Sequence, residues 1–244
     1  MINIQKLKRS NDRKVTNRVT ANGKQSAMKN TFGLPSGIAY SCRGETPTCK
    51  RVCYAGRLEK MYPSVRAVLL HNWLLLKDAD YNTMVSLLDD MVNDYLKDCN
   101  KHPSVDKIFR IHWDGDFFSD EYTVAWAEVV YRHPTVRFWV YTRVESSAIV
   151  LKNIPNLSLY YSTDVDNESI GARLKKTYGI KLAYLEDTFE AGGIRLKVLT
   201  GKVGAMCPEN KGVIPLISTL GSACGVCRLC VDNKTDIRFS ITKG

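Results

Sequence analysis

The sequence predicts a mixed α/β fold, a partial six-stranded parallel (β/α) barrel followed by an irregular, cysteine-rich C-terminal extension. Short β-rich runs alternate with stretches whose apolar residues repeat at helical spacing, and this order implies parallel strands joined by right-handed crossovers. The regularity ends near residue 201, where glycine and cysteine become frequent. With 244 residues, 44% of them hydrophobic, the chain is long enough to bury a core of its own.

The strands and helices follow from the spacing of apolar residues. Strands are expected at 38–40, 107–113, 136–141, 157–161, 180–185 and 195–199, with a late candidate at 236–241. Helices are expected at 64–77, 82–99, 119–132, 145–152 and 167–176. Within the strand 107–113, alternation with a period of two places Arg110 and His112 on the same face.

Composition divides the chain into three regions. These are a basic, partly disordered arm (1–30), the α/β body with a three-cysteine loop (31–200) and a cluster-binding extension (201–244). The arm carries eight Lys or Arg residues against Asp12 alone, within a net charge of +10. It could follow a nucleic-acid backbone or be a solvated terminus. No run approaches the roughly 18 apolar residues of a membrane span, and no export signal is evident, so a cytoplasmic protein without membrane contact is expected.

The strongest motif is a group of four cysteines near the C-terminus. The segment SACGVCRLC contains Cys224, Cys227 and Cys230, and Cys207, followed by proline, lies upstream. This arrangement follows the ligand pattern of bacterial-type iron–sulfur sites. Zinc is the alternative, although zinc sites more often use two separate Cys-x2-Cys pairs. We therefore expect a [4Fe-4S] cluster here.

A second group has three cysteines, Cys42, Cys49 and Cys53, in SCRGETPTCKRVCYAG. A structural zinc ion requires four ligands and disulfides an even number, whereas three thiolates can hold a four-iron cluster with one iron open to a small molecule. Zinc with His71 as fourth ligand is the alternative. The remaining thiol, Cys99, continues an apolar helical stripe and is expected to be buried.

Polar residues and glycines follow most of the expected strands. Functional groups of parallel α/β folds gather where the strands end. Those ends carry Cys42, Asp114 to Asp116, Thr142 and Arg143, Ser162 to Asp164, Glu186 and Asp187, and Gly201 and Lys202. The site is expected at this edge, although Asp114 or Asp116 could instead stabilise the turn before a helix capped by Ser119.

Several long motifs resemble the mycobacteriophage gene product 88 family. They are FGLPSG, SCRGETPTCKRVCYAG, the Asn72-Trp73 of LLHNWLLL, FRIHWDGDFFSDEYTVAW, VRFWVYTR and CGVCRLC. The resemblance runs from about Phe32 to the end of the chain. It implies a phage or prophage protein of largely undetermined activity.

A looser resemblance is to the radical S-adenosylmethionine enzymes, which place a three-cysteine loop after the first strand of a partial barrel and a glycine-acid motif after the second. The loop at Cys42, Cys49 and Cys53 matches in location, and Gly115-Asp116 matches the motif. The spacing departs from the usual Cys-x3-Cys-x2-Cys, because here it is six and three residues. The acid is also Asp in Gly-Asp-Phe, where these enzymes have Glu after a double glycine.

This second resemblance implies roles for the strand-end residues. Asp116, with Gly115, would hold the methionine ammonium of S-adenosylmethionine. Arg143, Ser162 and Asp164 would position the sulfonium, the ribose or the substrate. The four C-terminal thiolates would hold an auxiliary [4Fe-4S] cluster that relays electrons or binds substrate, and the electron donor would be a flavodoxin or ferredoxin.

Three functions remain open from the sequence. The first is a radical enzyme acting on a small molecule, a nucleotide or a nucleic acid. The second is an iron–sulfur enzyme without a radical, whose open iron acts as a Lewis acid or carries sulfur. The third is a basic nucleic-acid-binding module stapled by zinc.

Overall fold

The computed structural model describes residues 5–21 and 24–242. Its centre is a six-stranded sheet in which every neighbouring pair of strands is parallel. The strands, in spatial order, are β3 (Ile108–Ile111), β4 (Arg137–Thr142), β5 (Leu157–Thr163), β6 (Lys181–Glu186), β10 (Ile237–Ser240) and β7 (Ala205–Met206). The predicted α/β class with a six-stranded parallel sheet is therefore confirmed.

Four helices come before β3 in the chain, and later helices connect the strands of the main sheet. They are α1 (Pro47–Val52), α2 (Tyr54–Met61), α3 (Pro63–Leu76), α4 (Tyr81–Asn100), α5 (Asp120–Arg132), α6 (Glu145–Leu151), α7 (Glu168–Tyr178), α8 (Phe189–Thr200) and α9 (Ala223–Cys227). Side-chain caps set several of their starts: Ser119 accepts a hydrogen bond from the Tyr122 amide at the start of α5. At the other end of α7 and α8, Gly179 and Gly201 take the left-handed backbone that stops a helix.

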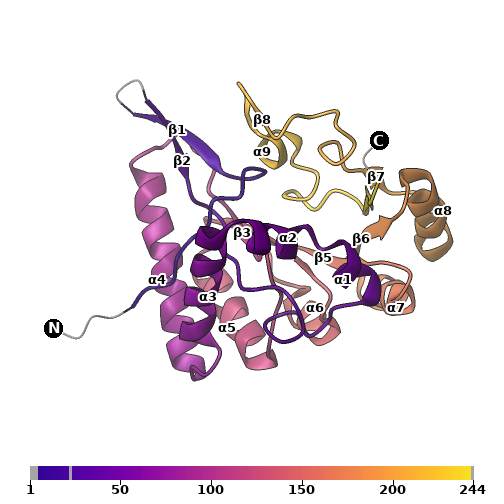
Figure 1. Ribbon diagram of the computed structural model, residues 1–244, viewed down its shortest axis with the longest axis horizontal. Coiled ribbons are helices and arrows are strands. Elements are labelled where there is room, and N and C mark those ends of the chain that lie inside the picture. The colour runs from indigo at the N-terminus through magenta and orange to yellow at the C-terminus, as the bar shows by residue number, and fades with distance from the viewer. Residues whose placement is uncertain (1–4, 22–23, 243–244) are drawn as a thin grey trace.

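The two faces of the sheet have different covers (Figure 1). Helices α4 to α8 bury one face, where Phe109 and Leu182 belong to the main core. The opposite face is covered by the two ends of the chain, because Val15 and Val231 pack there against Trp139. Figure 1 shows this second cover as the yellow C-terminal segment above the sheet. The fold thus places the cysteine-rich segment on the face that the helices leave open.

The expected strand at 38–40 is wrong. Those residues form a turn, and Ile38 is 68% exposed. The chain runs beside β3 slightly earlier, where Phe32 and Leu34 are fully buried. The Phe32 amide donates to the Arg110 carbonyl over 3.1 Å, and the Trp113 amide donates to the Phe32 carbonyl over 2.9 Å. The chain therefore pairs with β3 at residues 30–34, and a turn over residues 37–41 separates this segment from Cys42.

The expected strand at 195–199 is also wrong, since those residues lie inside α8. The Thr188 side chain accepts a hydrogen bond from the Ala191 amide and starts this helix. Its two glycines, Gly192 and Gly193, face Arg238 of β10, so the sequence Glu-Ala-Gly-Gly is a close helix–strand contact and not a turn. The late candidate at 236–241 is confirmed as β10, which enters the sheet between β6 and β7. Residues 201–244 thus contribute two strands to the main sheet.

The basic arm is packed against the body over its described residues. Leu7 and Val15 are 7% and 2% exposed. The Lys8 amide donates to Asn72 of α3, and the Asn72 amide donates back to the Lys8 carbonyl. Strands β1 (Asn17–Ala21) and β2 (Lys24–Met28) pair antiparallel after this segment. Over its described residues, 5–21 and 24–30, the arm is therefore packed against the body, whereas a solvated, partly disordered terminus was expected.

Arg110 and His112 do not share a face as expected. Arg110 lies over the rings of Trp139 and Tyr141, on the face that the chain ends cover. His112 follows the end of β3 with a φ of 54° and packs its ring against Phe117 on the helical side. Because the strand ends at Ile111, alternation no longer governs the next residue.

Candidate functional site

The three-cysteine loop is organised around two short helices. Thr46 caps α1, because its hydroxyl accepts a hydrogen bond from the Cys49 amide over 3.0 Å. Cys53 ends α1 and starts α2, where its sulfur accepts a hydrogen bond from the Gly56 amide over 3.3 Å. Pro47 occupies the first turn of α1, a position where its missing amide costs nothing. Local sequence therefore fixes where Cys49 and Cys53 lie relative to each other.

Hydrogen bonds hold this loop against the carboxyl edge of the sheet, as predicted. The Thr46 hydroxyl donates to the Asp164 carboxylate over 2.7 Å, and Asp164 directly follows β5. The Arg143 guanidinium, which follows β4, donates to the same carboxylate over 2.6 Å. Asp164 is fully buried, so these contacts form a buried polar link between the loop and two strand ends.

The three thiols of the loop lie close enough to influence one another electrostatically. Cys49 is within electrostatic reach of both Cys42 and Cys53, because the negative charge of one thiolate would raise the pKa of its neighbour. Burial raises the pKa of all three thiols above that of an ordinary cysteine. At Cys49 the guanidinium of Arg143 opposes this rise through its charge and a hydrogen bond. Arg143 is thus the positively charged residue that favours the thiolate form of Cys49.

Asp116, expected to bind a cofactor ammonium, is occupied by internal contacts. One carboxylate oxygen accepts from the Thr142 hydroxyl over 2.7 Å and from the Phe117 amide over 2.8 Å. The other accepts from the Arg143 amide over 2.8 Å. Asp116 is 7% exposed, and burial raises its pKa while these hydrogen bonds lower it. The carboxylate therefore joins the ends of β3 and β4, which is the turn-stabilising alternative.

Gly115 serves a close approach of two backbones. Its φ is 80°, and a side chain there would lie 2.7 Å from the Leu34 carbonyl oxygen and against the Ser41 hydroxyl. Protein atoms therefore fill the space that was expected to admit a ligand. Ser162 engages the site through its carbonyl, which accepts from the Arg143 guanidinium over 3.3 Å.

Asp114 is a member of the site that sequence reasoning named only as a turn residue. Burial and the nearby Glu59 carboxylate raise its pKa to about 9, so it holds a proton at neutral pH. One carboxyl oxygen of Asp114 accepts a hydrogen bond from the Gly115 amide over 2.9 Å. Glu59 in turn accepts from the Ser36 amide over 2.8 Å. Two neighbouring carboxyl groups, of which Asp114 is buried, thus lie beside the cysteine loop, and their separation by 55 residues in the sequence concealed the pair.

The four C-terminal cysteines also converge. Cys230 lies within electrostatic reach of Cys207, Cys224 and Cys227. Burial raises the pKa of Cys230 to about 12, although a hydrogen bond from the Tyr141 hydroxyl lowers it. Cys207 and Cys230, which are 23 positions apart in the sequence, therefore lie near each other and near the other two cysteines of the motif.

Arg110 is the positively charged residue beside this second group of cysteines. Its guanidinium is buried, and its charge lowers the pKa of both Cys224 and Cys230, in each case against the rise that burial causes. It pairs with Asp12 over 2.7 Å and lies 5.6 Å from the centre of the Tyr141 ring. Each thiol group therefore lies near one arginine, and no sequence pattern marked Arg110 as a site residue.

The N-terminal segment lies between the two thiol groups. The Lys14 carbonyl accepts a hydrogen bond from the Cys224 amide over 2.8 Å, and its ammonium pairs with Glu209 over 2.8 Å. The same ammonium lies 5.3 Å from the centre of the ring of Tyr54, the residue that follows Cys53. Residues 12–15 are thus a structural link between the two groups.

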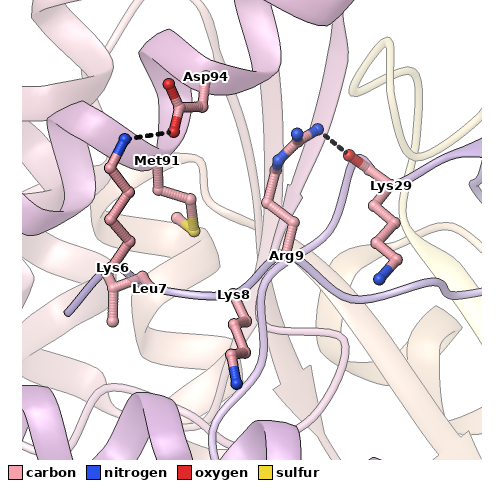
Figure 2. A pocket seen from close by; sticks show the side chains of 7 residues that line it. All are labelled: Lys6, Leu7, Lys8, Arg9, Lys29, Met91 and Asp94. Carbon is pink, nitrogen blue, oxygen red and sulfur yellow. Dashed lines mark hydrogen bonds and ion pairs between the residues drawn. The ribbon is translucent and has the colours of Figure 1, made fainter.

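Other cations of the arm are paired with acids of α4. Figure 2 shows a pocket at this junction, in which Lys6 pairs with Asp94 over 3.0 Å. Arg9 in the same pocket reaches the Lys29 carbonyl over 2.6 Å and also pairs with Asp98. Three cations of the arm, Lys6, Arg9 and Lys14, are therefore neutralised by acids of the protein, which weakens the expectation that these residues follow a phosphate backbone.

Cys99 lies apart from both groups, as predicted. It is 1% exposed in the core of α4, and its sulfur is 3.8 Å from that of Met28. His71 is also engaged elsewhere, because its ring contacts the Lys6 carbonyl over 2.8 Å. Seven cysteines are thus divided three and four, with the eighth in the core. Across the described ranges 5–21 and 24–242, no helix is both long and apolar enough to cross a bilayer.

These features define a class of protein: an α/β protein with an open parallel sheet, a three-cysteine loop at its carboxyl edge and a four-cysteine segment on one face. The chain belongs to the Gene product 88 family, whose model matches residues 5–233. This match begins at residue 5 and so includes most of the basic arm, whereas the motifs of the sequence analysis begin at about Phe32.

Two relatives come from mycobacteriophages. The chain is 47% identical to the Gene 88 protein of Mycobacterium phage L5 over 243 residues, which cover 98% of this chain and 99% of that protein. It is 47% identical to the Gene 88 protein of Mycobacterium phage D29 over 243 residues, which cover 97% and 98%. No solved structure matches. The resemblance to the phage family is confirmed, and these relatives do not support the looser one to radical S-adenosylmethionine enzymes.

Proposed function

We propose that this protein is an iron–sulfur enzyme with two [4Fe-4S] clusters, one open and one closed. The observation that carries the proposal is that partly buried cysteines gather in a group of three and a group of four, each near an arginine whose charge lowers the pKa of at least one thiol. Burial raises the pKa of most of these thiols and so favours their protonated form. A bound metal and a nearby cation together would favour the thiolate. A purely structural role for these cysteines would not explain why they form two groups.

The donor set suits a cluster better than a single ion. All seven donors are thiols, the soft ligands of iron–sulfur clusters and zinc. A single zinc ion holds its sulfurs at about 2.3 Å and so draws them close to one another. Among the described residues, no three His, Cys, Asp or Glu side chains are arranged to hold one metal ion. A four-iron cluster binds each thiolate on a separate iron, so its ligands need not surround one ion.

The protein's own residues then have defined roles. Cys42, Cys49 and Cys53 would hold the open cluster, while Cys207, Cys224, Cys227 and Cys230 would hold the closed one. When bound, the open cluster supplies an iron that can accept a substrate atom and exchange an electron. Arg143 offsets the negative charge at Cys49 and, through Asp164, keeps the loop on the strand ends.

The form of chemistry favoured by the contacts is the one without a radical. The radical form needs a free carboxylate for the methionine ammonium, and Asp116 already accepts three internal hydrogen bonds. Lewis-acid or sulfur-transfer chemistry requires no such carboxylate. Incubation of the reduced protein with S-adenosylmethionine separates the two, because only the radical form releases 5′-deoxyadenosine and methionine.

Metal analysis of matched cysteine variants tests the proposal. Protein purified without oxygen should contain iron and acid-labile sulfide in equal amounts. Cys49→Ala and Cys227→Ala should each lose about half of both, because each variant breaks one group. Cys99→Ala is the control and should keep the full content. Zinc in place of iron, or full iron in Cys49→Ala, would overturn the assignment.

A further inference from the structure

The surface around the three-cysteine loop carries several positively charged side chains without a close acidic partner among the described residues. Five cations lie on α1, α2 and the first turn of α3, and all five are exposed: Lys50, Arg51, Arg57, Lys60 and Arg66. Among the described residues, none of them forms an ion pair within 4.0 Å. We call this set the helical basic surface.

The acid of this stretch faces inward. Between residues 47 and 67 the sequence contains only Glu59 as an acid. Glu59 accepts from the Ser36 amide and interacts with buried Asp114, so it does not screen the outer cations. The arm differs, because Lys6, Arg9 and Lys14 are all paired with acids. On the three helices all five cations lack an ion pair among the described residues, whereas in the arm Lys6, Arg9 and Lys14 are paired.

An aromatic ring and an apolar side chain accompany the cations. Tyr62, between α2 and α3, is 48% exposed, and Met61 beside it is 64% exposed. Arg57 and Lys60 lie three residues apart on α2, so they share a helix face, and Met61 is four residues from Arg57. Cations beside an exposed ring are the combination that binds unpaired nucleotides, through phosphate contacts and stacking on a base.

We propose that the helical basic surface binds single-stranded nucleic acid, with its phosphates on the five cations and a base stacked on Tyr62. Lys50 and Arg51 lie in the chain between Cys49 and Cys53, so a bound strand would pass over the mouth of the three-cysteine loop. The inference stands apart from the proposed metal chemistry, because it uses only the charge and exposure of surface side chains.

The test is fluorescence anisotropy of the full-length protein with a labelled 20-nucleotide single strand of mixed sequence, over a range of salt concentrations. Neutralising Lys50, Arg57, Lys60 and Arg66 to Gln should weaken binding at least tenfold. Each lost phosphate contact should also flatten the slope of log affinity against log salt by about 0.7. Tyr62→Ala should weaken binding about tenfold with the salt slope unchanged, because stacking releases no counterions.

The matched control neutralises four exposed cations elsewhere: Lys176, Lys197, Lys202 and Lys211. Both quadruple variants remove the same net charge, so only location differs, and the control should keep at least half of the affinity. Equal losses in both would overturn the inference, as would wild-type binding of polyglutamate as tight as that of the oligonucleotide. Should the quadruple variant fail to fold by circular dichroism, Tyr62→Ala and the pair Lys60→Gln, Arg66→Gln give the same comparison.

Discussion

Asp12→Asn is the sharpest test of how the N-terminal segment is used. Asp12 and Arg110 are 11% and 10% exposed in their side chains, and their charged atoms are 2.7 Å apart. Breaking one partner of a buried pair costs about 3–5 kcal/mol, because the other charge remains buried. The new amide oxygen can still accept from the Lys14 amide, and Arg110 keeps its contacts with Tyr54 and Tyr141. We therefore expect the lower end, about 3 kcal/mol.

Urea unfolding of a double-mutant cycle measures this value. Arg110→Met alone leaves the Asp12 carboxylate buried, whereas the double variant removes both charges. The double variant should therefore cost less than the sum of the single changes, by about 2 kcal/mol. Lys6→Gln, which breaks an exposed pair with Asp94, should cause no measurable change. Additive single effects, or a cost for Asp12→Asn as small as that of the control, would show that the segment is not docked through this pair.

Three further changes have defined outcomes. Removing residues 1–29 should abolish cooperative thermal unfolding, measured by circular dichroism, because Leu7, Val15 and Met28 are buried and Asp12 neutralises Arg110; a truncated chain that melts like the full one would contradict the packing described. Cys99→Ala should keep its metal and lose about 1 kcal/mol of stability in urea, since it removes one buried sulfur. Asp114→Asn should gain stability relative to the wild type as pH rises. The pKa of Asp114 is about 9 when folded and about 4 when unfolded, so the wild type loses stability between these pH values and the variant does not. Urea unfolding at about pH 5 and pH 8.5 measures the difference, and an equal difference at both would refute the buried proton.

The sequence predicted the parallel sheet because β3 to β6 are apolar runs separated by helices with clear periodicity. It misplaced the runs at 38–40 and 195–199 for two physical reasons. Three residues are too few to set a register, and the chain pairs where Phe32 and Leu34 can be buried. Residues 195–199 are compatible with either structure, and the Thr188 cap with contacts from α8 to β10 selects the helix.

The cysteines could be grouped from spacing alone, but the residues around them could not. Arg143 was found because it follows a strand, and its contact with Cys49 agrees with a place in the site. Arg110 was missed as a site residue because it lies within β3, and its partner Asp12 is 98 residues away. The same limit applies to Asp116, whose three donors come from two strand ends. Long-range hydrogen bonds decide these roles, and no local pattern encodes them.

Native mass spectrometry of the anaerobically purified wild-type chain tests the central claim most directly, because it weighs whatever the two thiol groups hold. The account predicts a protein mass increased by two four-iron, four-sulfide clusters, about eight irons in all. It also predicts that one cluster is lost first on mild oxidation, since an open cluster has only three thiolate ligands. A mass increased by one or two zinc ions, or by nothing while the chain remains folded, would contradict it.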